Sequence, residues 1–381
     1  MINASGDHAL GAADLATMLR HETQARSVIG CSAAGVLAGT AEIEQKTGVS
    51  VLAASLPGVE IVPLSRDTLR KVSDEGTEAF IRHLPADHAG RHAATVVFAD
   101  PFSTPVASLI TGLGAAHTRS GEGPVLFGGV ASGAETPGGN TLILDDDACF
   151  EGAVGLALLG DLRCDIAVSQ GCRPIGPNLT VTRAKGNLLL RLDDRPALEV
   201  LRAVVHGLGE RDRKLLAGGL FLGRSIHDSK AHLGRGDYLI RNVVGADEDS
   251  GGVAVADILP EGATVRLHFR DATTATEDLE LLLDAQQLHG PPAGAFLVTC
   301  NGRGERFFGK QNHDSVTIQR AFLPAESGSE AAKSGEAITP PSAPVPLAGF
   351  FAAGEIGPIG DQSFLHGYTA CLACFRETDG N

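Results

Sequence analysis

Glycine is the residue that most constrains how this chain can fold. The 381 residues include 48 glycines, and glycine alone reaches positive φ without a steric penalty. Several glycines follow short apolar runs: Gly30 comes after Val28-Ile29, and Gly354 comes shortly after Phe350-Phe351. The sequence therefore predicts buried strands that run into tight turns or into close contacts between backbones.

The order of apolar patterns predicts a mixed α/β fold. Residues 92–98 and 124–130 are β-rich, and between them the apolar residues of segment 103–116 recur at helical spacing. A strand, a helix and a strand in this order are typical of a crossover unit. Residues 140–192 hold short β-rich runs in succession, which predict an antiparallel meander.

Two motifs of small residues repeat along the chain. Gly128-x-x-Ala131-x-Gly133 matches Gly349-x-x-Ala352-x-Gly354, and Cys31-x-x-x-Gly35 matches Cys300-x-x-x-Gly304. Chance recurrence in a chain rich in glycine and alanine is one explanation. The other is a protein of two related halves, with a site where they meet. The fold class that follows is α/β (mixed α+β), with two related halves that are each a mixed sheet flanked by helices.

The length of the chain exceeds that of a usual single domain. We predict an N-terminal helical segment over residues 1–27, a first domain over 28–215 and a second domain over 216–381. Residues 323–346 are rich in Ala, Ser, Gly, Glu and Pro. Such a segment buries too little apolar surface to offset its ordering entropy, so we predict a flexible insertion within the second domain.

Composition excludes several classes of partner. The net charge of −15 repels phosphate backbones and anionic lipid surfaces, and the absence of Trp leaves few platforms for base stacking. No apolar run approaches the roughly 18 residues of a membrane span, and the N-terminal residues lack the pattern of a signal peptide. Seven scattered cysteines fit a reducing compartment. We predict a cytoplasmic protein without nucleic-acid or membrane partners.

A carboxylate and an imidazole lie close in sequence near the C-terminus. Gly354-Glu355-Ile356-Gly357 places Glu355 at a strand end between glycines, and His366-Gly367-Tyr368-Thr369 follows after a short interval. On adjacent strands, Glu355 and His366 could transfer a proton or bind an amine. A salt-bridged hairpin is the alternative interpretation.

Three arginines stand in polar segments at predicted strand ends. Arg173 lies in a loop braced by prolines, where it either pairs with a ligand carboxylate or lies on the surface of a rigid turn. Strand alternation puts Arg241 and Asn242 on opposite faces. Asn301 and Arg303 lie on a glycine turn, where they bind a ligand or cap backbone groups.

The segment Gly30-Cys31-Ser32-Ala33-Ala34-Gly35 has two interpretations. It forms either a backbone nest that offers amides and the Cys31 thiol to a ligand, or a close contact around a small buried cysteine. Cys371-x-x-Cys374 lacks a second pair of zinc ligands. The sequence contains neither a P-loop triplet nor a glycine fingerprint for a dinucleotide.

Taken together, the glycine-rich strings resemble the FIST family of sensory domains over about residues 28–374, with the FIST N-terminal region in the first predicted domain and the FIST C-terminal region in the second. The strings that carry the resemblance are Gly30-Cys31-Ser32-Ala33-Ala34-Gly35, Phe98-Ala99-Asp100-Pro101, Phe127-Gly128-Gly129-Val130-Ala131-Ser132, Gln170-Gly171-Cys172-Arg173-Pro174-Ile175-Gly176, Leu239-Ile240-Arg241-Asn242, Phe269-Arg270-Asp271-Ala272, Cys300-Asn301-Gly302-Arg303-Gly304, Gly349-Phe350-Phe351-Ala352-Ala353-Gly354-Glu355-Ile356-Gly357 and His366-Gly367-Tyr368-Thr369.

This resemblance implies a sensor of small ligands, such as amino acids or their derivatives, that does no chemistry. It also implies a separate signalling partner, because the chain shows no kinase, cyclase or receiver segment. The residues that we predict to bind the ligand are Cys31, Ser32, Gly128, Gly129, Ser132, Arg173, Arg241, Asn242, Asn301, Arg303, Glu355, His366 and Thr369.

Two alternatives stay open. We predict no cofactor, but some family members resemble haem-binding nitric-oxide sensors, and a haem-binding gas sensor is therefore the first alternative. The second is a cysteine-dependent enzyme. In it, Cys31, Cys172 or Cys300 would act with Glu355 and His366 on an amide or a thioester.

Overall fold

The computed structural model describes residues 1–9, 11–114, 125–226, 233–323 and 345–378. Contacts divide the chain into a first unit of Met1–Val168, Leu279–Leu365 and Thr369–Asn381, and a second unit of Ser169–Asp278 and His366–Tyr368. The limits of these two units differ from the predicted domain boundary between residues 215 and 216. That domain boundary stays a prediction. The predicted flexible insertion at 323–346 lies almost wholly outside the described residues.

The first unit contains most of the strands. Its elements, three of which (β12, α7 and β23) extend across the limit between the units, are β1 (Ile2–Ser5), η1 (Gly6–Ala9), α1 (Ala12–Thr23), β2 (Ile29–Ala33), β3 (Gly35–Ala38), β4 (Ala41–Glu44), β5 (Gly48–Val51), β6 (Val59–Leu64), α2 (Arg66–Glu75), α3 (Thr77–His83), β7 (His92–Ala99), α4 (Val106–Gly114), β8 (Val125–Val130), β9 (Leu142–Leu144), β10 (Asp147–Cys149), β11 (Ala153–Gly160), β12 (Arg163–Gln170), α7 (Ala272–Gln287), β20 (Gly294–Cys300), α8 (Glu305–Phe308), α9 (His313–Ala321), β21 (Leu347–Ala352), β22 (Gly354–Ile359), β23 (Gln362–His366) and β24 (Thr369–Arg376).

Two six-stranded mixed sheets form the centre of the first unit. Their strand orders are β23-β22-β8-β7-β11-β6 and β12-β24-β20-β21-β3-β4. Phe98 and Phe127 of the first sheet pack with Phe296 and Phe350 of the second in one apolar core. The rings of Phe98 and Phe350 meet edge to face at 5.4 Å, a favoured aromatic geometry. A third sheet, in the order β10-β9-β2-β1-β5, contributes Ile29, Cys31 and Ala33 to the same core.

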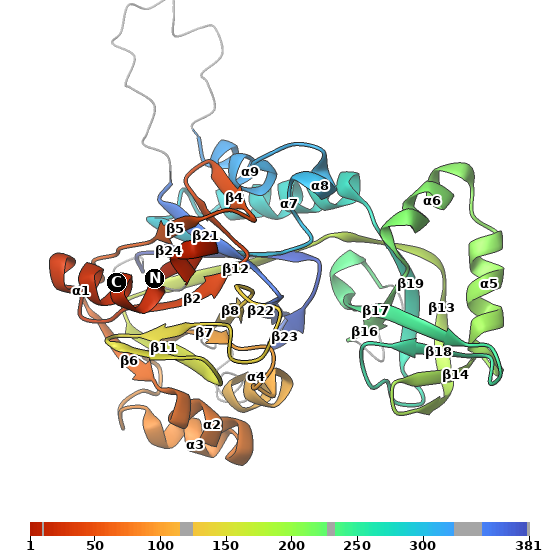
Figure 1. Ribbon diagram of the computed structural model, residues 1–381, viewed down its shortest axis with the longest axis horizontal. Coiled ribbons are helices and arrows are strands. Elements are labelled where there is room, and N and C mark those ends of the chain that lie inside the picture. The colour runs from red at the N-terminus through yellow and green to blue at the C-terminus, as the bar shows by residue number, and fades with distance from the viewer. Residues whose placement is uncertain (10, 115–124, 227–232, 324–344, 379–381) are drawn as a thin grey trace, which may run out of the picture. The chain divides into compact units, whose positions relative to one another are not determined.

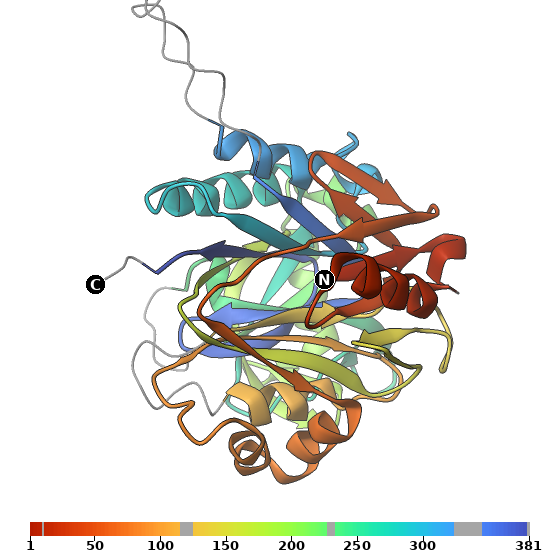
Figure 2. The same cartoon turned by 90° about the vertical axis from the view of Figure 1, so that its left-hand side faces the viewer.

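Helices cover the outer faces of these two sheets. α2, α3 and α4 pack together on the sheet that contains β7 and β11, where Leu69, Phe80 and Leu109 are buried with Val97 (Figures 1 and 2). On the other sheet, Leu283 of α7 and Ile318 of α9 pack against Leu297. The mixed α/β class and the arrangement of mixed sheets flanked by helices are confirmed.

The predicted crossover unit is also confirmed. β7 and β8 are parallel neighbours, and α4 lies between them in sequence. The predicted antiparallel meander over residues 140–192 is wrong. β9 pairs with β2, β11 pairs with β6 and β7, and β12 lies beside β24 in another sheet. The local alternation predicted strands, but their partners lie far away in the chain, which sequence periodicity does not reveal.

One glycine in each of three parallel strand pairs permits a close approach. Gly30 of β2, Gly128 of β8 and Gly349 of β21 lie opposite residues of β1, β7 and β20. A Cβ added at any of the three would lie 1.9 Å from a carbonyl oxygen of the neighbouring strand. Each glycine opens the same motif, Gly-x-x-Ala-x-Gly. The copies at residues 128 and 349 form the predicted repeat, and residues 30–35 are a third copy.

The second unit is built around one antiparallel sheet. Its elements are β13 (Cys172–Lys185), β14 (Leu188–Leu192), β15 (Arg195–Pro196), α5 (Ala197–His206), α6 (Glu210–Leu215), η2 (Leu216–Gly218), β16 (Phe221–Ser225), η3 (Arg235–Asp237), β17 (Tyr238–Asp247), β18 (Gly252–Val255) and β19 (Thr264–Arg270).

The strands of the second unit form a closed ring. The pairings run β13-β19-β16-β17-β18-β14, and β14 pairs with β13 again. β13 closes the ring because it is 14 residues long and contains register shifts, so that its first part pairs with β19 and its last part with β14. Val181, Leu267 and Phe269 are buried with Val200 of α5 in the core of this unit.

We predict that Gly349→Ala lowers the free energy of unfolding by about 3 kcal/mol, because the new methyl group collides with the Leu297 carbonyl oxygen of a buried strand. Gly114→Ala is the control, since a Cβ at the end of α4 meets nothing within 4 Å and alanine favours a helix. Urea unfolding of both variants provides the measurement. Equal stability of the two variants would contradict the close-approach argument.

Candidate functional site

The structure divides the predicted site residues between the two units. Nine of them belong to the first unit: Cys31, Ser32, Gly128, Gly129, Ser132, Asn301, Arg303, Glu355 and Thr369. The other four belong to the second unit: Arg173, Arg241, Asn242 and His366. Glu355 and His366 therefore belong to different units, and the role of all thirteen in ligand binding stays a prediction.

The ends of β2, β8 and β21 form a cyclic set of hydrogen bonds, which we call the three-strand junction (residues 32–34, 130–132 and 351–353). The amide of Ser132 donates to Ser32 O at 3.3 Å, and the amide of Ala353 donates to Val130 O at 3.0 Å. The third link passes through the Ser132 hydroxyl, which accepts from the Ala34 amide at 2.9 Å and donates to Phe351 O at 2.5 Å. Ser132 thus joins all three strand ends.

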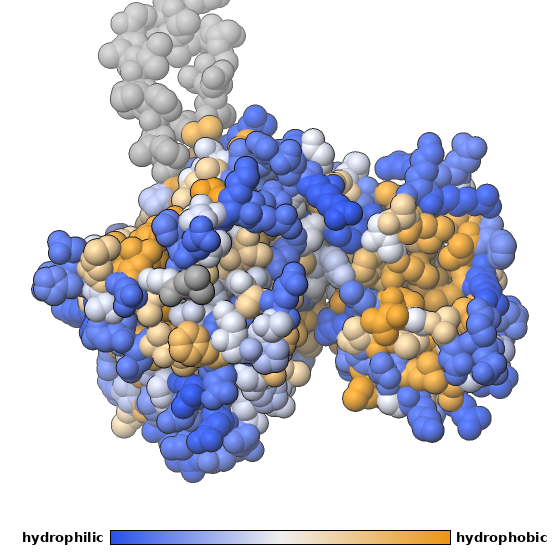
Figure 3. All heavy atoms as spheres, in the orientation of Figure 1, coloured by the Kyte–Doolittle hydropathy of each residue, from blue (hydrophilic) through white to orange (hydrophobic). Residues whose placement is uncertain are grey.

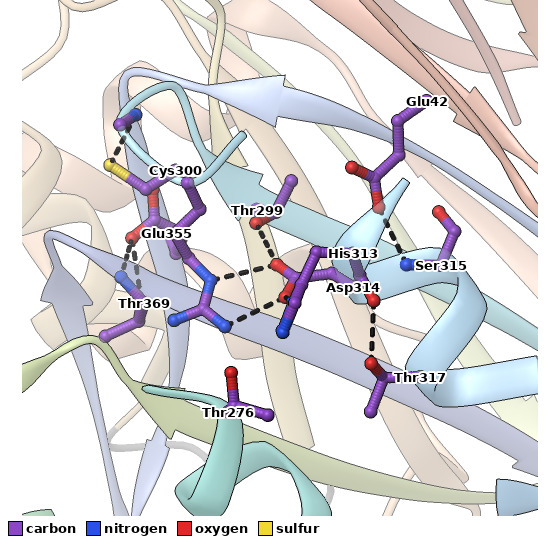
Figure 4. Close-up of polar contacts among 12 residues, drawn as sticks. Glu42, Thr276, Thr299, Cys300, His313, Asp314, Ser315, Thr317, Glu355 and Thr369 are labelled. Carbon is purple, nitrogen blue, oxygen red and sulfur yellow. Dashed lines mark hydrogen bonds and ion pairs between the residues drawn. The ribbon is translucent and has the colours of Figure 1, made fainter. Parts of the chain in front are cut away.

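Glu355 lies in β22, which directly follows the junction segment 351–353 in the chain, and is fully buried. Its Oε2 accepts hydrogen bonds from the amide of Thr369 at 3.1 Å and from the Thr369 hydroxyl at 2.7 Å, and its carboxyl also contacts the side chain of Cys300 (Figure 4). Burial raises the pKa of Glu355 from 4.5 to about 8, although Thr369, Arg303 and Cys300 each lower it. Glu355 is therefore an enclosed, mostly protonated acid at neutral pH, so a ligand amine could not pair with it as a surface carboxylate.

Arg303 is buried beside Glu355 and pairs with Asp314 in α9. Its Nε and Nη2 donate to the two carboxylate oxygens at 2.9 and 3.0 Å. Thr299 donates to the same carboxylate at 3.0 Å, and His313 contacts it at 2.9 Å. Burial raises the pKa of Asp314, but the Arg303 charge and the His313 contact outweigh burial and hold that pKa well below its usual range. The pair fixes α9 against the end of β20.

The two predicted site arginines of the second unit, Arg173 and Arg241, also have acidic partners within that unit. Arg173 contacts Asp271 at 3.1 Å and Asp212 at 2.6 Å, and Arg241 contacts Asp257 at 2.9 Å. Asp271 is buried, whereas the pairs with Asp212 and Asp257 are half-buried and weak, on the order of 1 kcal/mol or less. A ligand carboxylate could bind these arginines only in exchange for such a partner.

Two of the three cysteines considered for catalysis are enclosed. Cys31 and Cys172 are at most 2% exposed, whereas Cys300 is half-buried. Burial raises the pKa of the Cys31 thiol far above its usual range, which disfavours a thiolate nucleophile. Among the described residues, no three His, Cys, Asp or Glu side chains are grouped so as to hold a metal ion.

A cleft opens in the first unit beside the N-terminal ends of α2 and α4. Two adjoining hollows of about 270 and 320 Å³ share Arg66, Ser103 and Glu151. We call this surface the α2–α4 cleft. Arginine, carboxylate and hydroxyl groups gather along it, and the surface over α2 and α3 is largely hydrophilic (Figure 3). The polar side chains that line it include Arg66, Arg70, Asp74, Ser103, Thr104 and Glu151.

Asp100, directly after β7, shapes the wall of this cleft. Its Oδ2 accepts from the amides of Phe102 and Ser103 and from the Ser103 hydroxyl, at 2.6–3.1 Å. Its Oδ1 accepts from Asn140 at 3.0 Å. The Asn140 Oδ1 in turn accepts from the Ser32 hydroxyl at 3.3 Å. A continuous chain of buried polar groups therefore links the cleft to the three-strand junction.

The family models cover almost the whole chain. The FIST N domain model matches residues 1–195, and the FIST C domain model matches residues 197–358. The chain belongs to the FIST family. FIST domains are sensory, signal-transduction domains that bind small ligands. In the described residues, no helix combines the length and the apolar composition needed to cross a membrane.

The FIST relatives found among curated proteins come from mycobacteria. An uncharacterized protein of Mycobacterium tuberculosis is 37% identical over 373 residues, which cover 97% of this chain and 89% of that relative. An uncharacterized protein of Mycobacterium bovis is 36% identical over 371 residues, with 97% and 88% covered. These similarities extend over both FIST domains.

The α2–α4 cleft could not be predicted from the sequence because four segments that are distant in the chain build it. They are residues 66–74, 100–109, 137–138 and 148–153. One signal was present: Phe98-Ala99-Asp100-Pro101 ends a strand and precedes hydroxyl residues at a helix start. Ligands of α/β proteins often bind beyond the carboxyl ends of parallel strands, and Asp100 occupies that position.

We predict that the Glu355 carboxyl makes stability fall as pH rises. The pKa is raised in the folded protein, so the stabilisation is complete below about 4.5 and is lost as pH rises through about 8. The free energy of unfolding of the wild type, measured against Glu355→Gln, should therefore decrease by about 1 kcal/mol per pH unit between pH 5 and 8.

Urea unfolding at several pH values provides this measurement. Glu75→Gln is the control, because Glu75 is an exposed carboxylate in a surface pair with Arg82. The control should follow the wild type at every pH. A constant difference between wild type and Glu355→Gln over this range would contradict a buried, protonated Glu355.

Proposed function

We propose that this FIST protein senses a small zwitterionic ligand, an amino acid or a derivative of one, and does no chemistry on it. The observation that carries the proposal is the α2–α4 cleft, whose lining offers both signs of charge together with hydroxyl groups. An amino acid carries a carboxylate and an ammonium a few ångströms apart, and both need partners when they leave water. We propose no resident cofactor and a separate signalling partner.

Arg66 is the group that we assign to the ligand carboxylate. It lines both hollows and contacts Glu151 at 3.3 Å. The Arg66 and Glu151 side chains are 46% and 67% exposed, so breaking their ion pair requires little free energy. A ligand carboxylate could then take the guanidinium, which matches it in geometry. The released Glu151, or Asp74, would hold the ligand ammonium.

The position of the cleft supports a sensory role. Ser103 and Thr104 line it, and they are tied to the start of β11: Gly152 N donates to Ser103 Oγ at 2.8 Å, and Thr104 Oγ1 donates to Gly152 O at 2.6 Å. A ligand that contacts these hydroxyl groups would change the hydrogen bonds of Asp100, and Asp100 connects through Asn140 to the three-strand junction. Binding could therefore alter a region that many strands share.

A thermal-shift screen of amino acids, amines and dicarboxylates tests this function. A ligand at 100 times its Kd should stabilise the protein by about 2.7 kcal/mol. We predict that a zwitterionic amino acid raises the melting temperature and that Arg66→Gln abolishes the shift, because the ligand carboxylate loses its partner.

The matched control is Arg82→Gln, which removes an exposed arginine of α3 that pairs with Glu75 outside the cleft lining. Arg82→Gln should keep the full shift. A hit whose shift is the same in wild type and Arg66→Gln would place the ligand elsewhere. A screen without any hit would contradict the ligand class.

A further inference from the structure

Cys300 ends β20 in a polar environment unlike that of the buried cysteines. It is half-buried, and the amide of Gly302 points at its sulfur with an N–S distance of 3.5 Å. The Glu355 carboxyl interacts with its side chain. Figure 4 shows the bond between the amide and the Cys300 sulfur. An amide that points at a sulfur stabilises negative charge there, and thiolate character controls cysteine reactivity.

The guanidinium of Arg303 supplies a second group beside this cysteine. Arg303 is 1% exposed and uses Nε and Nη2 on Asp314. Because the guanidinium is planar, the two hydrogen bonds from Nε and Nη2 leave Nη1 pointing away from the carboxylate. Among the described residues, this buried Nη1 has no hydrogen-bond acceptor, and after Asp314 the charges that act on Arg303 are those of Cys300 and Glu355. A buried donor without an acceptor destabilises the folded protein. A small polar molecule bound beside Nη1 would supply the missing acceptor.

We propose that Cys300 is a peroxide-reactive thiol, with Arg303 Nη1 as the donor that binds the peroxide and Glu355 as the acid. A hydroperoxide has the size and the acceptor oxygens for such an occupant. This site lies apart from the α2–α4 cleft and does not depend on the proposed amino-acid ligand.

The reaction balances with the peroxide as the only co-reactant. The Cys300 thiol loses its proton to water, and the sulfur attacks one peroxide oxygen, so that an S–O bond forms and the O–O bond breaks. The departing hydroxide takes the proton of Glu355 and leaves as water, and Glu355 regains a proton from solvent. The sulfur is oxidised to sulfenic acid and the peroxide is reduced. The raised pKa of Glu355, about 8, keeps that proton in place at neutral pH.

Dimedone trapping of the reduced, full-length protein tests the proposal. The protein is exposed to hydrogen peroxide with dimedone, and mass spectrometry follows each cysteine. Cys149 is the internal control, because it is also half-buried. Cys149 also lies near an amide, a guanidinium and a carboxylate, but its Arg66 and Glu151 neighbours are exposed and pair with each other. We expect Cys300 to be trapped about tenfold faster or more, since the buried Arg303 guanidinium and the buried Glu355 acid act on its sulfur. Trapping at Cys149 that is equal or faster, or no trapping at Cys300, would overturn the proposal.

The Glu355→Gln variant distinguishes acid catalysis by Glu355 from the accessibility of the Cys300 thiol to reagents. The variant keeps the shape of the side chain but removes its proton, so the peroxide rate at Cys300 should fall about a hundredfold. Alkylation of Cys300 by iodoacetamide needs no acid for its leaving iodide and should stay unchanged. If the oxidation and alkylation rates of Cys300 fell together in Glu355→Gln, or if the oxidation rate did not fall, Glu355 would be excluded as the acid and the proposal contradicted.

Discussion

The close approach of three parallel strand pairs is the constraint on which the rest of the first unit depends. At Gly30, Gly128 and Gly349, a Cβ would lie 1.9 Å from a neighbouring carbonyl oxygen, so glycine alone fits there. The ends of β2, β8 and β21 then approach closely enough to form hydrogen bonds. Backbone amides link β8 to β2 and β21 to β8, and the Ser132 hydroxyl links β2 to β21. Three sheets thereby share one hydrogen-bonded junction.

Two polar regions adjoin this junction and differ in what they can do. Glu355, Arg303 and Asp314 are buried; Arg303 pairs with Asp314, and Thr369 donates hydrogen bonds to Glu355. These residues therefore suit the support of Cys300 better than direct contact with a charged ligand. The α2–α4 cleft is open and carries both signs of charge. The chain from Asp100 through Asn140 to Ser32 connects the cleft to the junction, which gives a bound ligand a physical route to the shared strands.

The sequence could predict the features that local patterns encode. The apolar runs and glycine turns indicated the mixed α/β class, the crossover from β7 through α4 to β8, and the family. The partners of Arg173, Arg241 and Arg303 stayed hidden, because Asp212, Asp257 and Asp314 are distant in sequence or lie on other elements. The burial of Glu355 could not be predicted either, since its glycine neighbours indicated only the end of a strand. The third small-residue motif, Gly30-x-x-Ala33-x-Gly35, has the same spacing as the other two copies, but the spacing alone does not show that all three glycines face a neighbouring carbonyl oxygen.

Hydrogen–deuterium exchange with the amino acid that gives the largest thermal shift tests the central claim most directly. The account predicts slower exchange at the start of α2, in residues 100–105 and in residues 149–153, because a ligand in the α2–α4 cleft covers these amides and rigidifies their loops. Slower exchange confined to other segments, with these three unchanged, would contradict it.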